Sequence, residues 1–514
     1  MHAAASLYAK MAQPAPDPAA AALTADPLTQ LPLEDPAQFS ISCTTFQNIY
    51  RDAQPLFAEW APTLTDPAAA TKLFWPTLSR YGLPYNLLIL KKIDAAAAPA
   101  LQAKFQTAWT PAHDALVAGG ALYAIDLSLF TILQPHSAGG AIRFTPATIT
   151  LLRQDAVTKD LTPIAVWVAG YQSAGAQIFV AGSATDSAWL YALQAAKTSA
   201  TLYGIWLGHV YHWHIVTSAM QMTMYNNLVA GTPLYQLVAP QSKYVMAFDN
   251  VLLLLWEFGA PPTSVTTSSQ FLELCNAFAA NRNYFDDDPT VAIQQLGLRE
   301  ADFTVATPWD KYPIVAQFLT IWNATTDYVN AFVDASYNND AAVAQDAALQ
   351  AWMAAAAKPD DGNIRGLPPM VSKDALRRVL TSLLYRVTMH GAARLPQVAS
   401  PGLTFVANFP PCLQDATIPA PNQNFDTRRL LQYLPRTGTI GGMVTFYYIF
   451  GFSVPYESFV SVNGIEANLF FANGMANPCN QALVKYRQAI IAMATTISAP
   501  SAPQIAQWPL NIET

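Results

Sequence analysis

Residues 206–216 read WLGHVYHWHIV and place His209, His212 and His214 in one apolar stretch. This stretch lies inside a helix-period segment predicted over residues 187–229. On a regular α-helix His209 and His212 share a face, whereas His209 and His214 diverge by about 140°. A π-bulge, which has i→i+5 hydrogen bonds, would bring His209 and His214 together instead. The spacing leaves both pairs open.

A second helical segment, predicted over residues 372–394, carries His390 in the stretch LYRVTMHGAAR. His390 continues an apolar stripe at helical spacing, which predicts that it faces the core. The stripe consists of Leu376, Val379, Leu380, Leu383, Leu384 and Val387. A buried histidine is often only a hydrogen-bonded core residue, but imidazoles also bind Fe, Zn, Cu and Ni. On the residues alone, core packing and a shared metal site remain as alternatives for these histidines.

The composition predicts one large globular domain. Of 514 residues, 52% are hydrophobic and 12% are charged, against about 25% charged in an average soluble domain. The net charge of -7 provides no basic surface for a polyanion, so we expect no nucleic-acid partner. Residues 13–37 alternate Ala, Pro and Asp, and residues 1–38 are predicted to form an N-terminal extension to a single domain over 39–514. We expect a monomer.

The expected fold is mainly α-helical with a small β-subregion. Three short β-rich runs predict the sheet, namely ALYAIDLSLF (121–130), LTPIAVWVAG (161–170) and AQIFVAG (176–182). Helical periodicity predicts further segments over 187–229, 243–258, 268–280, 311–357, 372–394, 427–434, 440–453 and 480–497. The proline-rich stretch 399–422 is predicted to be a long coil over the surface or around a site.

No targeting or membrane-spanning segment is predicted. The N-terminus has no sustained apolar run, so we expect no signal peptide and a cytoplasmic protein. The uncharged stretch 437–456 approaches the length that spans a bilayer, but its four glycines and the following Glu457 favour a buried helix. The cysteines are far apart and lack a CxxC motif, so they are expected to be buried thiols; they are Cys43, Cys275, Cys412 and Cys479.

The motifs and their order resemble those of the lipoxygenases. The central helix of that family carries a His-x4-His pair, matched here by His209-VYHW-His214, and continues to a turn matched by TPLYQL at 232–237. Similar family blocks occur upstream as LYAIDLSLF (122–130), LTPIAV (161–166) and the Trp189 to Lys197 spacing. Downstream matches are KYVMAFD (243–249), His390-GAAR, NFPP (408–411) and RRLLQYLP (428–435). The resemblance covers nearly the whole chain from about residue 39.

This resemblance implies a large single lipoxygenase-type helical catalytic domain with a long central helix and without the N-terminal β-sandwich of plant and animal members. It implies one non-haem iron per chain, or manganese in its place, bound by His209, His214, His390 and the main-chain carboxylate of Thr514. The implied activity is insertion of O2 into polyunsaturated fatty acids with a cis,cis-1,4-pentadiene to give hydroperoxides. The implied partners are the fatty acid and O2, with transient contact to a membrane surface.

The chain departs from the family pattern at Arg394, where the family usually has Asn. A guanidinium has no free lone pair for a metal, so either water fills that position or Arg394 turns away near a helix end imposed by Pro396. Gly259 and Ala260 lie near a small family residue that influences the position of oxygenation. With Arg394 they are candidate substrate-channel residues, although a glycine that ends a helix is the alternative for Gly259.

Arg394 also leaves two alternatives to a fatty-acid dioxygenase. One is an enzyme of the same fold with altered chemistry, such as hydroperoxide rearrangement or oxygenation of another lipid. The other is a non-catalytic lipid-binding protein.

Overall fold

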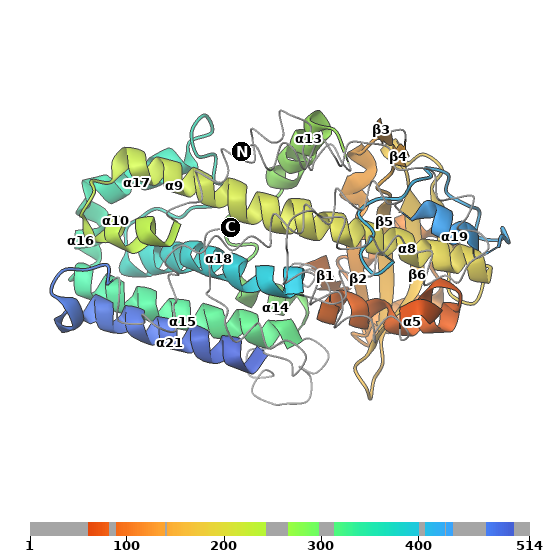
Figure 1. The fold of residues 1–514 in the computed structure, drawn as a ribbon, viewed down its shortest axis with the longest axis horizontal. Helices are drawn as coiled ribbons and strands as arrows, with labels where there is room; N and C mark the ends of the chain where they lie inside the picture. Colours follow the sequence, from red (N-terminus) through yellow and green to blue (C-terminus); the bar gives the residue numbers. More distant parts are fainter. Residues whose placement is uncertain are drawn as a thin grey trace, which may run out of the picture.

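The computed structural model describes residues 60–81, 89–138, 141–242, 266–297, 313–399, 407–426, 428–434 and 469–497. A long central helix runs through the molecule and joins a β-sheet region to a bundle of helices (Figure 1). It consists of α8 (Asp186–Leu202), the π-helical segment η8 (Tyr203–Ile215) and α9 (Val216–Asn227). The predicted segment 187–229 is therefore confirmed, and its middle third is wider than an α-helix.

The predicted small sheet is confirmed as five antiparallel strands in the order β1-β2-β5-β6-β7. The strands are β1 (Leu90–Lys92), β2 (Leu122–Leu127), β5 (Ala147–Gln154), β6 (Leu161–Ala169) and β7 (Gln177–Val180), with a separate hairpin of β3 (His136–Ala138) and β4 (Ala141–Arg143). Pro163 in β6 lies where the register with β5 shifts between Leu151 and Leu152. A bulge tolerates a residue without an N–H, which explains a proline inside this strand.

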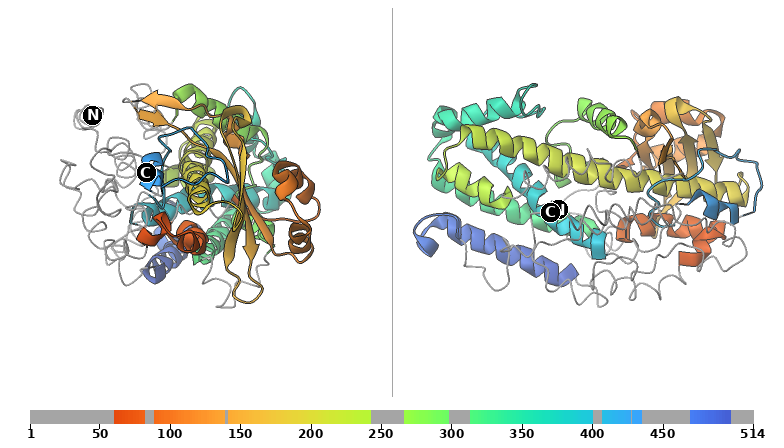
Figure 2. Two further views of the ribbon diagram at one scale, coloured as in Figure 1. Left: turned by 90° about the vertical axis from the view of Figure 1, so that its right-hand side faces the viewer. Right: turned by 45° about the horizontal axis from the view of Figure 1, so that its top comes forward.

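The central strand β5 was not among the predicted strands. Its sequence ATITLLRQ is buried from Ala147 to Leu152, because neighbouring strands flank it and α8 packs against the sheet. A strand buried on both faces lacks the alternation of apolar and polar residues that identifies a half-exposed strand. The two views in Figure 2 show α8 lying along the sheet.

The helices account for most of the described chain and bear out the expected mainly α class. The early helices are α5 (Pro67–Pro76), α6 (Ala98–Phe105) and α7 (Pro111–Ala118). After the central helix come α10 (Pro233–Val238), α13 (Ser268–Ala280), α14 (Pro289–Gln295), α15 (Pro313–Ser336), α16 (Asp340–Gln345), α17 (Ala347–Ala357), α18 (Lys373–Ala399), α19 (Arg428–Tyr433) and α21 (Pro478–Ile497). In the part of the bundle that is described, α15 packs along both α18 and α21.

Two helix predictions need correction. The segment 311–357 is interrupted twice, because Asn339 and Asp346 cap new helices by accepting hydrogen bonds from Ala342 N and Leu349 N. The helix that carries Arg394 does not end before Pro396 but continues to residue 399. Pro396 therefore lies within α18 rather than ending it, and it lacks the N–H that would bond the carbonyl four residues earlier.

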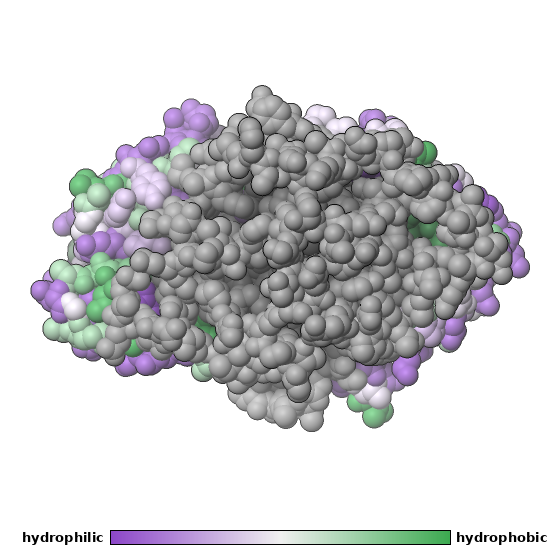
Figure 3. All heavy atoms as spheres, viewed as in Figure 1, coloured by the Kyte–Doolittle hydropathy of each residue, from purple (hydrophilic) through white to green (hydrophobic). Residues whose placement is uncertain are grey.

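Several predictions concern residues outside the described ranges. These are the extension 1–38, the helical segments 243–258 and 440–453, and the stretch 437–456 that was expected to be a buried helix. Among the helices that are described, none is long and apolar enough to cross a membrane. In the space-filling view hydrophilic and hydrophobic residues are interspersed at both ends of the described surface (Figure 3). Among the described residues, exposed large apolar side chains include Val157 and Val371.

The described part of the proline-rich stretch forms the predicted coil, and it lies against the sheet and α8. Leu413 pairs with Phe144 through two backbone hydrogen bonds of 2.6 and 2.7 Å. Thr185, the N-cap of α8, donates its hydroxyl to the carbonyl of Gln423 at 2.6 Å. The coil thus fixes the start of the central helix. The three described cysteines are buried free thiols, as predicted; they are Cys275, Cys412 and Cys479.

Lys197 on α8 is buried where this coil crosses the helix. It is 1% exposed, and its Nζ donates to the carbonyl of Ala407 at 3.3 Å. Burial disfavours the ammonium form and lowers the pKa of Lys197 to about 7. The helix therefore contains a lysine that is partly neutral near pH 7.

We predict that Lys197→Met flattens the pH dependence of the free energy of unfolding. The unfolded chain keeps the lysine proton up to its ordinary pKa of about 10.4, whereas the native state loses it near pH 7, so native stability rises with pH in between. One such proton contributes about 1.4 kcal/mol per pH unit. Urea titrations between pH 7 and 8.5 measure the two slopes, and equal slopes for wild type and variant would contradict the assignment.

Candidate metal centre

The three central histidines lie in the π-helical segment η8. All three are buried, with exposed fractions of 2 to 5%. The Nε2 atoms of His209 and His214 are 3.1 Å apart, and the two rings are inclined by 59°. Of the two pairs that the spacing allowed, the structure forms His209 with His214, because i→i+5 turns bring residues five apart to one face.

The histidine pair fits one metal ion. Two imidazole nitrogens at about 2.1 Å from a common ion and about 90° apart would be about 3.0 Å from each other, and the observed separation is 3.1 Å. With protein atoms alone the same contact is an N–H···N hydrogen bond, whose donor depends on the tautomers. Imidazole donors without thiolates suit iron, and also other first-row metals.

His212 does not join this pair. Its Nδ1 lies 2.5 Å from Oδ2 of Asp287, in the turn between α13 and α14. The other carboxylate oxygen, Oδ1, accepts a hydrogen bond from Nη2 of Arg282. The alternative pairing of His209 with His212 is therefore not what the structure contains.

Aromatic rings of α13 cover η8. The ring of Phe278 makes edge contacts with Tyr203, Tyr211 and His212, at centroid distances of 6.1, 5.3 and 5.3 Å. About two helical turns earlier in α13, the ring of Phe271 contacts the ring of Trp206 at a centroid distance of 5.0 Å. Tyr203, Trp206 and His212 are accordingly buried on this side of the π-helix.

Two neighbouring aspartates close to η8 differ in their ionisation. Burial raises the pKa of Asp287, but His212 and Arg282 more than offset this and hold that pKa well below its usual range. Burial raises the pKa of Asp288 to about 6, and its Oδ1 accepts a hydrogen bond of 2.5 Å from the Ser382 hydroxyl. Burial also lowers the pKa of His212. The buried His212–Asp287 contact thus joins an imidazole to a carboxylate that is also paired with Arg282.

The helix that carries the third predicted histidine passes beside η8. Arg386 on α18 donates to the carbonyl of Tyr284 and shares a small cavity with His212 and Asp287. Position 390 lies one turn later on the same face of α18. The side chains of His390 and Arg394, and the whole of Thr514, Gly259 and Ala260, lie outside the described part of the structure.

All four metal ligands stay predictions, including the two histidines that the structure brings together. Where side chains are described, no group of three or more His, Cys, Asp or Glu residues could hold a metal ion. Asp287 and Arg282 were not among the residues predicted for the site. The signal was available, because NRNYFDDDP (281–289) concentrates charge in a chain with few charged residues.

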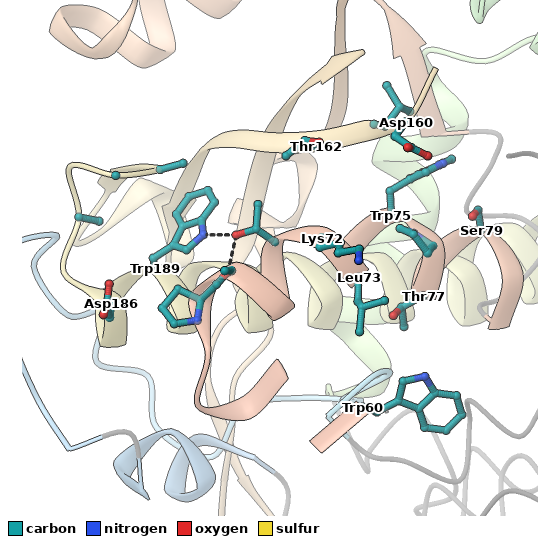
Figure 4. Close-up of a pocket in the computed structure, with 18 residues that line it drawn as sticks. Trp60, Lys72, Leu73, Trp75, Thr77, Ser79, Asp160, Thr162, Asp186 and Trp189 are labelled. Atoms are coloured by element: carbon teal, nitrogen blue, oxygen red, sulfur yellow. Dashed lines mark hydrogen bonds between the residues drawn. The ribbon is translucent and has the colours of Figure 1, made fainter. Parts of the chain in front are cut away.

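A separate cavity of about 780 Å³ lies between α5, the ends of β6 and β7, and the start of α8 (Figure 4). Trp60, Trp75 and Trp189 contribute to its lining, and Trp189 Nε1 donates to the Thr71 hydroxyl at 2.7 Å. Trp189 lies roughly 30 Å before His209 along the central helix, at a rise of about 1.5 Å per residue. This cavity is therefore not part of the histidine centre.

Comparison with known proteins relates this chain to one family. The family model for lipoxygenases matches residues 132–435. The chain is 24% identical over 328 residues to linoleate 9/13-lipoxygenase of Pseudomonas aeruginosa, covering 61% of this chain and 47% of that protein. It is 24% identical over 301 residues to polyunsaturated fatty acid lipoxygenase ALOX15B of Rattus norvegicus, covering 57% and 43%. The matches thus span about half the length of these relatives.

Solved structures give the same result for the fold. A lipoxygenase in complex with arachidonate superimposes with a TM-score of 0.72 at 16% identity, covering 92% of this chain and 73% of that one. A fungal lipoxygenase from Fusarium graminearum gives 0.70 at 14% identity, covering 89% and 81%. The architecture is that of a mainly helical lipoxygenase domain. The chain belongs to the lipoxygenase family.

We predict that His209→Ala and His214→Ala each lower the affinity of the protein for iron at least about tenfold, because each removes one donor of a metal site. Metal content after dialysis against a chelator, measured by mass spectrometry, checks this. Tyr211→Phe, in the same segment, is the matched control and should keep its metal. Full iron content in either histidine variant would contradict the site.

Proposed function

We propose that this chain is a non-haem iron dioxygenase that inserts O2 into polyunsaturated fatty acids containing a cis,cis-1,4-pentadiene. The product is a hydroperoxide, which contains all atoms of the fatty acid and of O2. The observation that carries the proposal is the 3.1 Å approach of two buried imidazole nitrogens in the central helix of a lipoxygenase-family chain. The names of its relatives, a linoleate lipoxygenase and a polyunsaturated fatty acid lipoxygenase, support the class of substrate.

The proposed ligands are His209, His214, His390 and the main-chain carboxylate of Thr514, with iron preferred and manganese as the alternative metal. The bound metal would supply one-electron redox chemistry for the oxidation of a bis-allylic C–H bond. The protein buries its described donors, with His209 and His214 only 3% and 2% exposed. Exclusion of water strengthens the electrostatic interactions inside a site and limits side reactions of reactive intermediates.

We predict that iron-loaded protein consumes oxygen with linoleic acid and forms conjugated diene in equal amount. His390→Ala should abolish both signals, because it removes a proposed ligand. His113→Asn, which changes a histidine in the capping box of α7, should retain them. An oxygen electrode and diene absorbance recorded on the same sample provide the measurement.

Absence of oxygen uptake by protein that contains iron would refute dioxygenation of this fatty acid. Conversion of an added lipid hydroperoxide under those conditions would indicate the rearrangement chemistry that Arg394 leaves open. Lipid binding with neither reaction would indicate the non-catalytic alternative.

A further inference from the structure

A π-helix depends on contacts that hold its wide turns in place. π-Helices are rare and mostly occur as single turns, yet η8 runs over 13 residues. If the same residues formed a regular α-helix, His209 and His214 would point about 140° apart. The backbone register of η8 therefore decides whether the two histidines meet.

His212 supplies a contact that can fix this register. Positions 209 and 214 return to one face after five residues, so position 212 between them points to another side of the helix. There its Nδ1 lies 2.5 Å from Asp287 Oδ2, and its ring packs against Phe278. The bond to a carboxylate places the imidazole proton on Nδ1. It ties the middle of the π-helix to a turn that is far away in sequence.

Asp287 is itself held in place by Arg282, which follows the end of α13 in the chain. Its Oδ1 accepts a hydrogen bond from Arg282, which leaves Oδ2 for His212. The guanidinium of Arg282 lies 4.6 Å from the centre of the Phe278 ring. Asp287 is 8% exposed, and a buried carboxylate with a paired cation and two hydrogen bonds has little freedom to move.

We infer that Asp287 is a positioning residue for the metal centre. Through its bond to His212 it fixes the register of η8, and this register places Nε2 of His209 beside Nε2 of His214. The inference rests on the proposed binding of a metal by this pair. It assigns a role to His212, Asp287 and Arg282, of which none is a proposed ligand.

The test compares the affinity of metal-free protein for Co²⁺ in matched variants. His212→Leu removes the bond to Asp287 but leaves the Asp287–Arg282 ion pair intact. In His212→Asn the side-chain amide can donate in place of Nδ1. Asp288→Asn is the control, because it changes the adjacent buried aspartate, which bonds Ser382 instead. Competition with a chelator gives the affinity, and the visible absorption of bound Co²⁺ reports its donors.

We expect Co²⁺ binding at least about tenfold weaker in His212→Leu, with altered absorption, and affinities within about threefold of wild type in His212→Asn and Asp288→Asn. If His212→Leu does not fold, the double variant Asp287→Leu/Arg282→Met removes both the acceptor of the His212 bond and its paired cation, so no buried charge is left unpaired, and the same loss is expected. Wild-type affinity and absorption in His212→Leu, or in this double variant where His212→Leu does not fold, would overturn the inference alone. If the wild-type protein binds no Co²⁺ and no iron, the proposed function fails and the inference fails with it.

Discussion

The width of the helical turns between Tyr203 and Ile215 determines which histidines of the central helix meet. With i→i+5 bonds, His209 and His214 approach to 3.1 Å, whereas i→i+4 bonds would separate them. The surrounding fold supports the wide turns. The sheet and the coil fix the start of the central helix through Thr185, and α13 covers η8 with aromatic rings. The long helix thus connects a rigid β-region to the site in the bundle.

Much of the fold could be predicted from local sequence patterns. Helical periodicity gave α13 and both ends of the central helix, and β-rich runs gave β2, β6 and β7. The central strand β5 was not predicted, because burial on both faces removes the alternation of apolar and polar residues that identifies a half-exposed strand. Asn339 and Asp346 are N-cap residues that divide the segment 311–357 into separate helices. The prediction from apolar periodicity treated this segment as one helix.

The candidate site was less predictable. The sequence indicated which histidines matter but left two pairings open, because the same spacing suits an α-turn or a π-turn. Contacts from distant residues distinguish them, and Asp287 lies 75 positions after His212 in the chain. The resemblance to lipoxygenases favoured His209 with His214, and the geometry agrees. Metal binding by His209, His214, His390 and Thr514 remains a prediction.

The most direct test is a crystal structure of the iron-loaded protein with anomalous scattering measured at the iron edge. We predict one strong peak at about 2.1 Å from Nε2 of both His209 and His214, with residues 203–215 in i→i+5 register and His212 bonded to Asp287. A peak beside His212, or a regular α-helix in which His209 and His214 lie apart, would contradict this account.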